Sequence, residues 1–90
     1  MMTEQKLIEL GFNPACKGFY YLKDAVNMTI SNKFVKKMFI YSNIAETYGD
    51  TKTRVERAIR HCIKKSKSNY NNDSNSMVFG KLAILVKSND

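Results

Sequence analysis

The chain has 90 residues, the length of one domain, and 43% of them are hydrophobic, which is enough for a packed core. Fifteen Lys and Arg against eight Asp and Glu give a formal charge of +7, which favours a polyanion such as DNA, RNA or an acidic membrane surface. No apolar run approaches the roughly 20 residues that span a bilayer, and the first ten residues lack the regions of a signal peptide. We therefore expect a single cytoplasmic domain, residues 1–90, that does not bind membranes.

The composition of potential reactive groups argues against catalysis. Cys16, Cys62 and the single histidine, His61, are too few and too separated for a metal site, so we expect no metal and no cofactor. Without a sign of export, two reduced thiols are expected, although a disulfide stays open. His61 has cationic neighbours instead of a carboxylate partner, and no phosphate-cradling glycine loop is present. We expect that the protein is not an enzyme.

Two helices are predicted in the first third of the chain. Thr3 can cap a short first helix that ends at Gly11, after which Phe12 folds back onto it. Apolar residues then recur at helical spacing from about residue 18 to residue 30. This second helix carries an aromatic cluster that we expect to be core rather than a stacking surface, Phe19, Tyr20 and Tyr21.

A third helix is predicted over residues 33–39 after a break at Ser31 and Asn32. Its apolar residues, expected to face inward, are Phe34, Val35 and Met38. Its outward lysines either form a solvated face or contact a phosphate backbone, and they are Lys33, Lys36 and Lys37.

Residues 41–65 have the pattern of a helix-turn-helix, in which a tight turn joins two helices and leaves the second one protruding. Ala45 allows close approach of the two helices, Gly49 allows the turn, and Val55 packs the second helix onto the first. Asp50 departs from the pattern, because such motifs often have an apolar residue there.

The second helix of the pair has two distinct faces. It begins either after Thr51, the preferred N-cap, or at a Thr53–Glu56 capping box. Its apolar face carries Val55, Ala58, Ile59 and Cys62. Its polar face carries Thr53, Arg57, Arg60, His61 and Lys64. The helix is therefore expected either to bury one face and present the other to DNA, or to form an ordinary hairpin with a solvated basic face.

The last quarter of the chain is predicted as an exposed polar loop, residues 66–76, followed by a C-terminal helix, residues 77–87. A buried strand is the alternative for KLAILVK, because short apolar runs are ambiguous. The predicted fold is thus all-α, a compact bundle of about six helices that contains a helix-turn-helix.

Three stretches carry a family resemblance: TRVERAIRHCIKK from Thr53, LGFNPACKGFYYLKDAV from Leu10 and SNSMVFGKLAILV from Ser74. They resemble the C-terminal DNA-binding domain of stage zero sporulation protein A, a sporulation response regulator. The resemblance implies that the second helix reads a DNA box containing TGTCGAA. Base contacts are implied for the residues that match Arg-x-Glu-Arg-x-x-Arg, namely Arg54, Glu56, Arg57 and Arg60. Backbone or flanking contacts are expected for Thr51, Lys52, Thr53, His61 and Lys64.

The resemblance also implies partners. We expect a transcriptional regulator at the nucleoid that lacks the family's N-terminal receiver domain, either as an isolated domain or as a stand-alone variant. RNA polymerase, a full-length sporulation regulator and a second copy on DNA are candidate partners. Two alternatives stay open: a protein-interaction module that modulates a sporulation or transcription regulator through its basic face, and a single-strand or RNA binder that uses the tyrosines.

Overall fold

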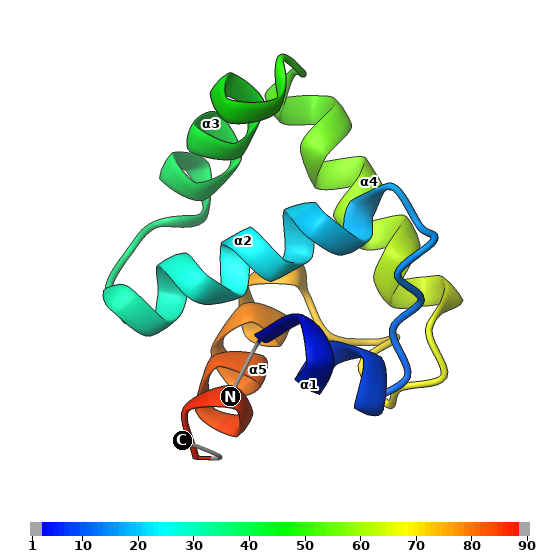
Figure 1. The fold of residues 1–90 in the computed structure, drawn as a ribbon. Coiled ribbons are helices and arrows are strands. Elements are labelled where there is room, and N and C mark those ends of the chain that lie inside the picture. Colours follow the sequence, from blue (N-terminus) through cyan, green and yellow to red (C-terminus); the bar gives the residue numbers. More distant parts are fainter. Residues whose placement is uncertain (1–2, 89–90) are drawn as a thin grey trace.

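The computed structural model describes residues 3–88, which fold as five α-helices without a strand among them (Figure 1). The helices are α1 (Thr3–Glu9), α2 (Gly18–Ser31), α3 (Lys37–Tyr48), α4 (Lys52–Lys65) and α5 (Asn75–Ser88). The predicted all-α class is confirmed, with five helices in place of about six. Residues 1, 2, 89 and 90 of the predicted domain lie outside the described part.

Helix α2 is the centre of the structure, because it contacts each of the other four helices. In Figure 1 it crosses the middle of the molecule, with α3 above it, α5 below it, and α4 running down on the right past its first turns. Its buried residues follow the predicted helical spacing, and they are Phe19, Tyr21, Leu22, Ala25 and Val26. Tyr20, which we expected in the core, is 40% exposed. The other predicted core aromatics, Phe19 and Tyr21, are buried.

The predicted separate helix over residues 33–39 is wrong. Asn32 leaves α2 in an extended conformation, and its side-chain oxygen accepts the N–H of Phe34 at 3.0 Å while its carbonyl accepts the N–H of Val35 at 3.0 Å. These two bonds close a turn over residues 32–35. Helix α3 therefore begins only at Lys37, and Phe34, expected inward, is 80% exposed.

The C-terminal segment is helical, as predicted, and the strand alternative is wrong. Helix α5 begins at Asn75, two residues before the predicted start, and buries Val78, Phe79 and Leu82 against α2 and α4. The preceding loop is less exposed than expected. The Tyr70 ring stacks on Phe12, with 6.3 Å between ring centroids, and the Lys67 N–H donates to the Gly11 carbonyl at 3.1 Å.

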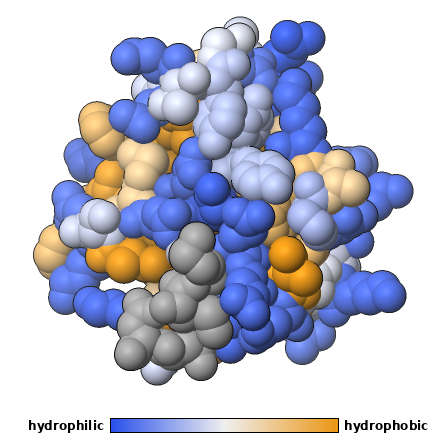
Figure 2. Space-filling model, in the orientation of Figure 1, coloured by the Kyte–Doolittle hydropathy of each residue, from blue (hydrophilic) through white to orange (hydrophobic). Residues whose placement is uncertain are grey.

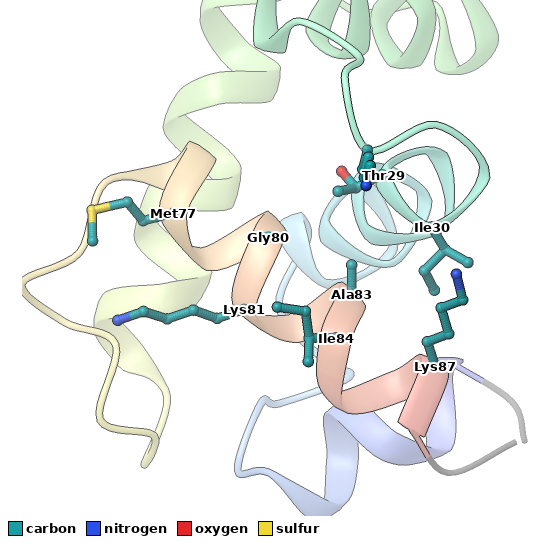
Figure 3. Close-up of a pocket in the computed structure, with 9 residues that line it drawn as sticks. Thr29, Ile30, Met77, Gly80, Lys81, Ala83, Ile84 and Lys87 are labelled. Carbon is teal, nitrogen blue, oxygen red and sulfur yellow. The ribbon is translucent and has the colours of Figure 1, made fainter.

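The surface mixes polar groups with separate apolar patches, as Figure 2 shows for one face. No helix within residues 3–88 has the length and apolar character needed to cross a membrane. A groove of about 480 Å³ lies between the second half of α2 and the outer side of α5 (Figure 3).

The backbones of α2 and α4 approach each other closely at Gly18, the first residue of α2. A methyl group on Gly18 would lie 2.1 Å from the carbonyl oxygen of Ala58 and 2.5 Å from its carbonyl carbon. Both atoms belong to the backbone of α4 and cannot move aside as a flexible side chain would. Glycine is therefore the residue that lets α4 lie this close to α2.

We predict that Gly18→Ala lowers the free energy of unfolding by about 1–3 kcal/mol, because the helices must separate to admit the methyl group. Gly80→Ala is the matched control: its methyl group would meet no atom within 4 Å, so the same substitution in α5 should add about 1 kcal/mol through helix propensity. Urea unfolding followed by circular dichroism measures both. A Gly18→Ala variant as stable as the parent protein would contradict the close approach.

Candidate nucleic-acid interface

Helix α4 is divided into a buried and an exposed face, as the sequence predicts. The buried residues are Val55, Ile59, Cys62 and Ile63. The exposed residues are Lys52, Thr53, Arg54, Glu56, Arg57, His61, Lys64 and Lys65. Burial raises the pKa of the Cys62 thiol to about 12, so this side chain is neutral and packs as a small apolar group. Eight polar or charged side chains of one helix therefore face solvent together.

The turn between α3 and α4 consists of residues 49–51 and has the geometry that the sequence predicts. Gly49 is left-handed, with φ 65° and ψ 40°, a conformation that suits glycine. The Asp50 N–H then donates to the Ala45 carbonyl at 2.9 Å, which closes the end of α3. Ala45 is buried, so its small side chain lies where the two helices meet.

Thr51 is the N-cap of α4. Its hydroxyl oxygen accepts the N–H of Arg54 at 3.2 Å, and the helix begins at the next residue, Lys52. The preferred cap is confirmed, and the alternative start at the Thr53–Glu56 capping box is wrong. Glu56 is thereby freed from a capping role, and its carboxylate lies on the exposed face.

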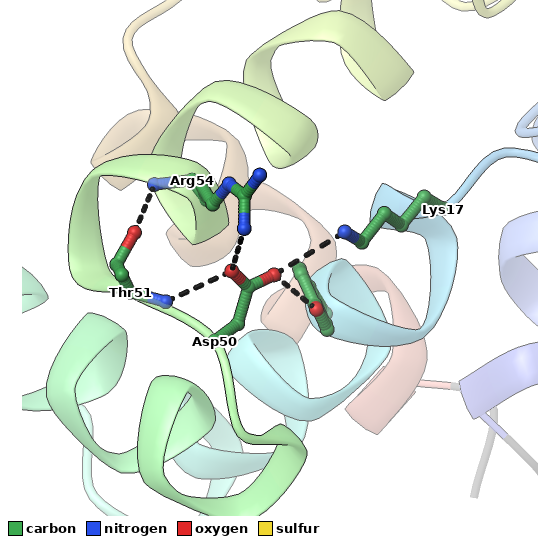
Figure 4. A network of polar contacts seen from close by, with 5 residues as sticks. Lys17, Asp50, Thr51 and Arg54 are labelled. Carbon is green, nitrogen blue, oxygen red and sulfur yellow. Dashed lines mark hydrogen bonds and ion pairs between the residues drawn. The ribbon is translucent and has the colours of Figure 1, made fainter.

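Asp50 ties the turn to the helix beneath it (Figure 4). One carboxylate oxygen accepts the Tyr21 hydroxyl at 2.7 Å and lies 3.4 Å from the Lys17 ammonium. The other accepts the Thr51 N–H at 2.9 Å and lies 3.9 Å from the Arg54 guanidinium. The Asp50 side chain is only 6% exposed. This network explains why the turn carries an aspartate where an apolar residue is usual.

The hydrogen bonds of this network shift two pKa values in opposite directions. The Tyr21 hydroxyl and then the Thr51 N–H hold the pKa of the Asp50 carboxyl below its ordinary value. Burial, followed by the bond to the Asp50 carboxylate, raises the pKa of Tyr21. Tyr48, the last residue of α3, contacts two residues of α2. Its ring lies 5.0 Å from that of Tyr21, and the bond from its hydroxyl to the Asp24 carboxylate, at 2.6 Å, raises the pKa of Tyr48 to about 12.

The four predicted base-contacting residues do not share one environment. Arg54, Glu56 and Arg57 are exposed, and the Arg54 guanidinium makes one long ion pair, 3.9 Å from the Asp50 carboxylate. The Arg60 guanidinium instead turns toward the loop after α4. It donates to the carbonyl of Asn71 at 2.7 Å, to the carbonyl of Asp73, and to the side-chain oxygen of Asn75 at 3.3 Å.

Asn75 extends this network into the core, a role that the sequence did not reveal. Its side-chain nitrogen donates to the Tyr41 hydroxyl at 3.1 Å and to the Glu56 carbonyl at 3.4 Å. Desolvation by burial raises the pKa of Tyr41. The polar network therefore joins α3, α4 and the start of α5. An asparagine in a polar Ser/Asn-rich stretch gives no signal that it is buried.

A polar pocket of about 450 Å³ opens beside the exposed face of α4. Its lining includes Lys37 at the start of α3, Glu56 and Arg57 of α4, and Ser74 and Ser76 on either side of the first residue of α5. Among Lys33, Lys36 and Lys37, it is Lys37 that shares this pocket with side chains of α4. Lys33 instead lines the groove between α2 and α5. Lys37 and the two serines are further candidates for phosphate contact.

The tyrosines offer little surface for stacking against unpaired bases. Tyr21 is buried and its hydroxyl is bonded to Asp50. Tyr20 is partly exposed, but its ring meets Phe19 edge-on at 5.2 Å and the Lys23 ammonium at 5.3 Å. Stacking proteins use several accessible aromatic faces along a strand, so Tyr20 and Tyr21, the two tyrosines that suggest this alternative, give it little support.

We predict that Asp50 makes the fold sensitive to acid. Because its pKa is lower in the folded state, its contribution to stability is complete above the ordinary carboxyl pKa of about 4 and is lost as the pH falls through the lowered value. Asp50→Asn should therefore show a shallower loss of stability below about pH 4. Urea unfolding at successive pH values measures this.

Tyr21→Phe is the matched variant, because it removes the main hydrogen bond to the carboxylate and keeps the charge. It should give a pH dependence between those of the parent protein and Asp50→Asn. Parallel pH profiles for all three proteins would mean that this network does not hold the turn.

A comparison with known protein families agrees with this site. Residues 3–89 match the family described as Sporulation initiation factor Spo0A C terminal. The match spans nearly the whole chain, so the resemblance found in the sequence is confirmed. The helix with the exposed arginines lies inside the matched range. The chain belongs to this family of C-terminal domains, which are the DNA-binding domains of a sporulation regulator.

Proposed function

We propose that the protein is a sequence-specific double-stranded DNA-binding regulator of transcription, and that α3, the turn and α4 act as a helix-turn-helix with α4 in the major groove. One observation carries the proposal. The exposed side of α4 presents Arg54, Glu56 and Arg57 from a helix that is anchored by its buried side and by its N-cap. A rigid helix with free, long, charged side chains is what base readout requires.

The proposed roles follow from the donors and acceptors of each side chain. Arg54 and Arg57 offer paired N–H donors to guanine O6 and N7, and Glu56 accepts from cytosine N4. Contacts with phosphates fix the register of the helix, and we assign them to the remaining exposed residues at its start and along its flank, Thr51, Lys52, Thr53, His61 and Lys64. Lys37, beside Arg57 in the polar pocket, extends this set.

Arg60 has a different proposed role. The sequence predicts that it contacts a base, which would require its guanidinium to leave three hydrogen-bond acceptors of the loop and α5. Hydrogen bonds to a charged group are worth about 1.5–3 kcal/mol, so leaving them is unfavourable unless the base contact replaces them. We propose that Arg60 positions the start of α5 beside α4 and that the three exposed residues read the bases.

The DNA sequence in the proposal comes from the family resemblance, a box containing TGTCGAA. The protein would act at the nucleoid, in the cytoplasm, as a binding protein and not as an enzyme. Two copies on adjacent boxes, and contacts with RNA polymerase or a full-length sporulation regulator, remain proposals that follow from the same resemblance. The alternative function is a protein-interaction module whose basic face binds an acidic partner. That alternative predicts equal affinity for all duplexes of the same length and charge.

The proposal predicts different effects for two cations of α4. Arg57→Ala should cost about 1–3 kcal/mol on a duplex with the TGTCGAA box and little on a scrambled duplex, because a base contact is lost. Lys64→Ala should weaken both duplexes alike and reduce the salt slope by about one, because a phosphate contact is lost. Fluorescence anisotropy at one fixed salt concentration, then over a salt series, separates the two. Equal binding of both duplexes by the parent protein would reject sequence-specific recognition.

Arg60→Ala should reveal whether Arg60 contacts a DNA base or positions the start of α5. We expect a loss of stability of about 1–3 kcal/mol, together with weaker binding of the boxed and the scrambled duplex by the same factor. Arg60→Lys, which keeps the charge but not the planar fork, should show the same pattern more mildly. A normal unfolding curve combined with a loss confined to the boxed duplex would instead assign Arg60 to base contact.

A further inference from the structure

The groove between α2 and α5 has an apolar floor that no part of residues 3–88 covers. Ile30 of α2 and Ala83 and Ile84 of α5 supply the floor (Figure 3). Ile84 is 68% exposed, and Met77, two turns earlier on α5, is 51% exposed. Large apolar side chains left in water along one helix face mark a contact surface more often than isolated ones do.

Gly80 lies in this groove and has no explanation in the packing of the chain itself. Its φ is not positive, and no atom lies within 4 Å of the position that a methyl group would take. A glycine inside a helix costs about 1 kcal/mol relative to alanine. The chain accepts this cost at a position where the methyl group of alanine would have room.

A helix of another molecule that packs against α5 would explain the glycine at position 80. When helices pack, a side chain of one enters a hole formed by four residues of the other at positions i, i+3, i+4 and i+7. Met77, Gly80, Lys81 and Ile84 have this spacing on the outer side of α5. The missing side chain at Gly80 deepens the hole, so that a large apolar residue can enter between Met77 and Ile84.

The charges around the groove have one sign. Lys33, Lys81 and Lys87 line its edges, and none of the lining residues is acidic. The Lys81 ammonium is bonded to the Asp73 carboxylate at 2.8 Å, whereas the Lys33 ammonium lies near the Phe34 ring at 5.3 Å. An occupant that also carried positive charge would be repelled, and a carboxylate would be attracted.

We propose that this groove docks an amphipathic helix of an acidic partner protein. An apolar side chain of the partner enters the hole at Gly80, and carboxylates on either side of it meet Lys33 and Lys87. The surface differs in chemistry from the exposed side of α4, where no large apolar side chain is exposed. The groove and α4 therefore bind different partners, and the proposal does not depend on DNA recognition.

Two synthetic helical peptides test the proposal. Both have leucine at the a and d positions of a heptad repeat, and the flanking positions are glutamate in one and lysine in the other. Two-dimensional ¹⁵N NMR of the full chain should show shifts of the Gly80, Ile84 and Ile30 amides with the acidic peptide and none with the basic one. Shifts of these amides with both peptides would overturn the proposal. Shifts confined to α4 would also overturn it, because they would show only that the acidic peptide is attracted to the basic surface.

Substitution of Gly80 gives the second arm. Gly80→Leu fills the hole with a good helix former whose Cβ would meet no atom of a neighbouring element within 4 Å, so the variant should fold and should bind the acidic peptide about tenfold or more weakly. Gly80→Ala should weaken binding of the acidic peptide less than Gly80→Leu does. Both variants should bind duplex DNA as the parent protein does. Unchanged peptide affinity of Gly80→Leu, or groove shifts that grow with the concentration of the protein alone, would contradict an acidic partner; the second result would identify another copy of the chain as the occupant.

Discussion

The contact between Gly18 and the backbone of α4 at Ala58 determines how the molecule is arranged. Because α2 touches every other helix, the position of α4 on α2 also fixes its relation to α3 and α5. A wider separation would move the buried side of α4, with Val55 and Ile59, out of the core. The packing of the buried side of α4 against α2 therefore fixes the direction in which the exposed side of α4 points.

Two polar networks hold the start and the middle of α4, and of the three proposed reading side chains Arg54 takes part, through its long ion pair with Asp50. At the start, Asp50 links the turn to Tyr21 of α2, while Thr51 caps the helix. Near the middle, Arg60 and Asn75 connect α4 to α5 and to Tyr41 of α3. Buried polar groups that are bonded in this way restrict the helix to one position. Because these hydrogen bonds lie inside the protein, the exposed arginines of α4 stay available for a ligand.

The features that repeat along the sequence were predictable, and those that depend on contacts between distant segments were not. The 3.6-residue period gave both faces of α4, and Gly49 and Thr51 gave the turn and cap, because these signals are local. The spacing of Phe34 and Met38 predicts a buried helix over residues 33–39, but both side chains lie outside the core. The inward turn of Arg60 and the burial of Asn75 depend on a loop that returns to α4. Neither feature has a local signal in the sequence. Arg60 also lies on the predicted polar face of its helix, which is the position expected for a residue that contacts a base.

The central claim is that arginines on the exposed side of α4 contact guanine in the major groove. Replacing one guanine of the TGTCGAA box at a time with 7-deazaguanine removes only the N7 acceptor on the major-groove edge. At one guanine, the parent protein should lose about 1–3 kcal/mol of affinity, while Arg57→Ala, which has already lost the contact, should bind the two duplexes almost equally. Full affinity of the parent protein for every 7-deazaguanine duplex, or the same loss in the parent protein and in Arg57→Ala at every guanine, would contradict the account.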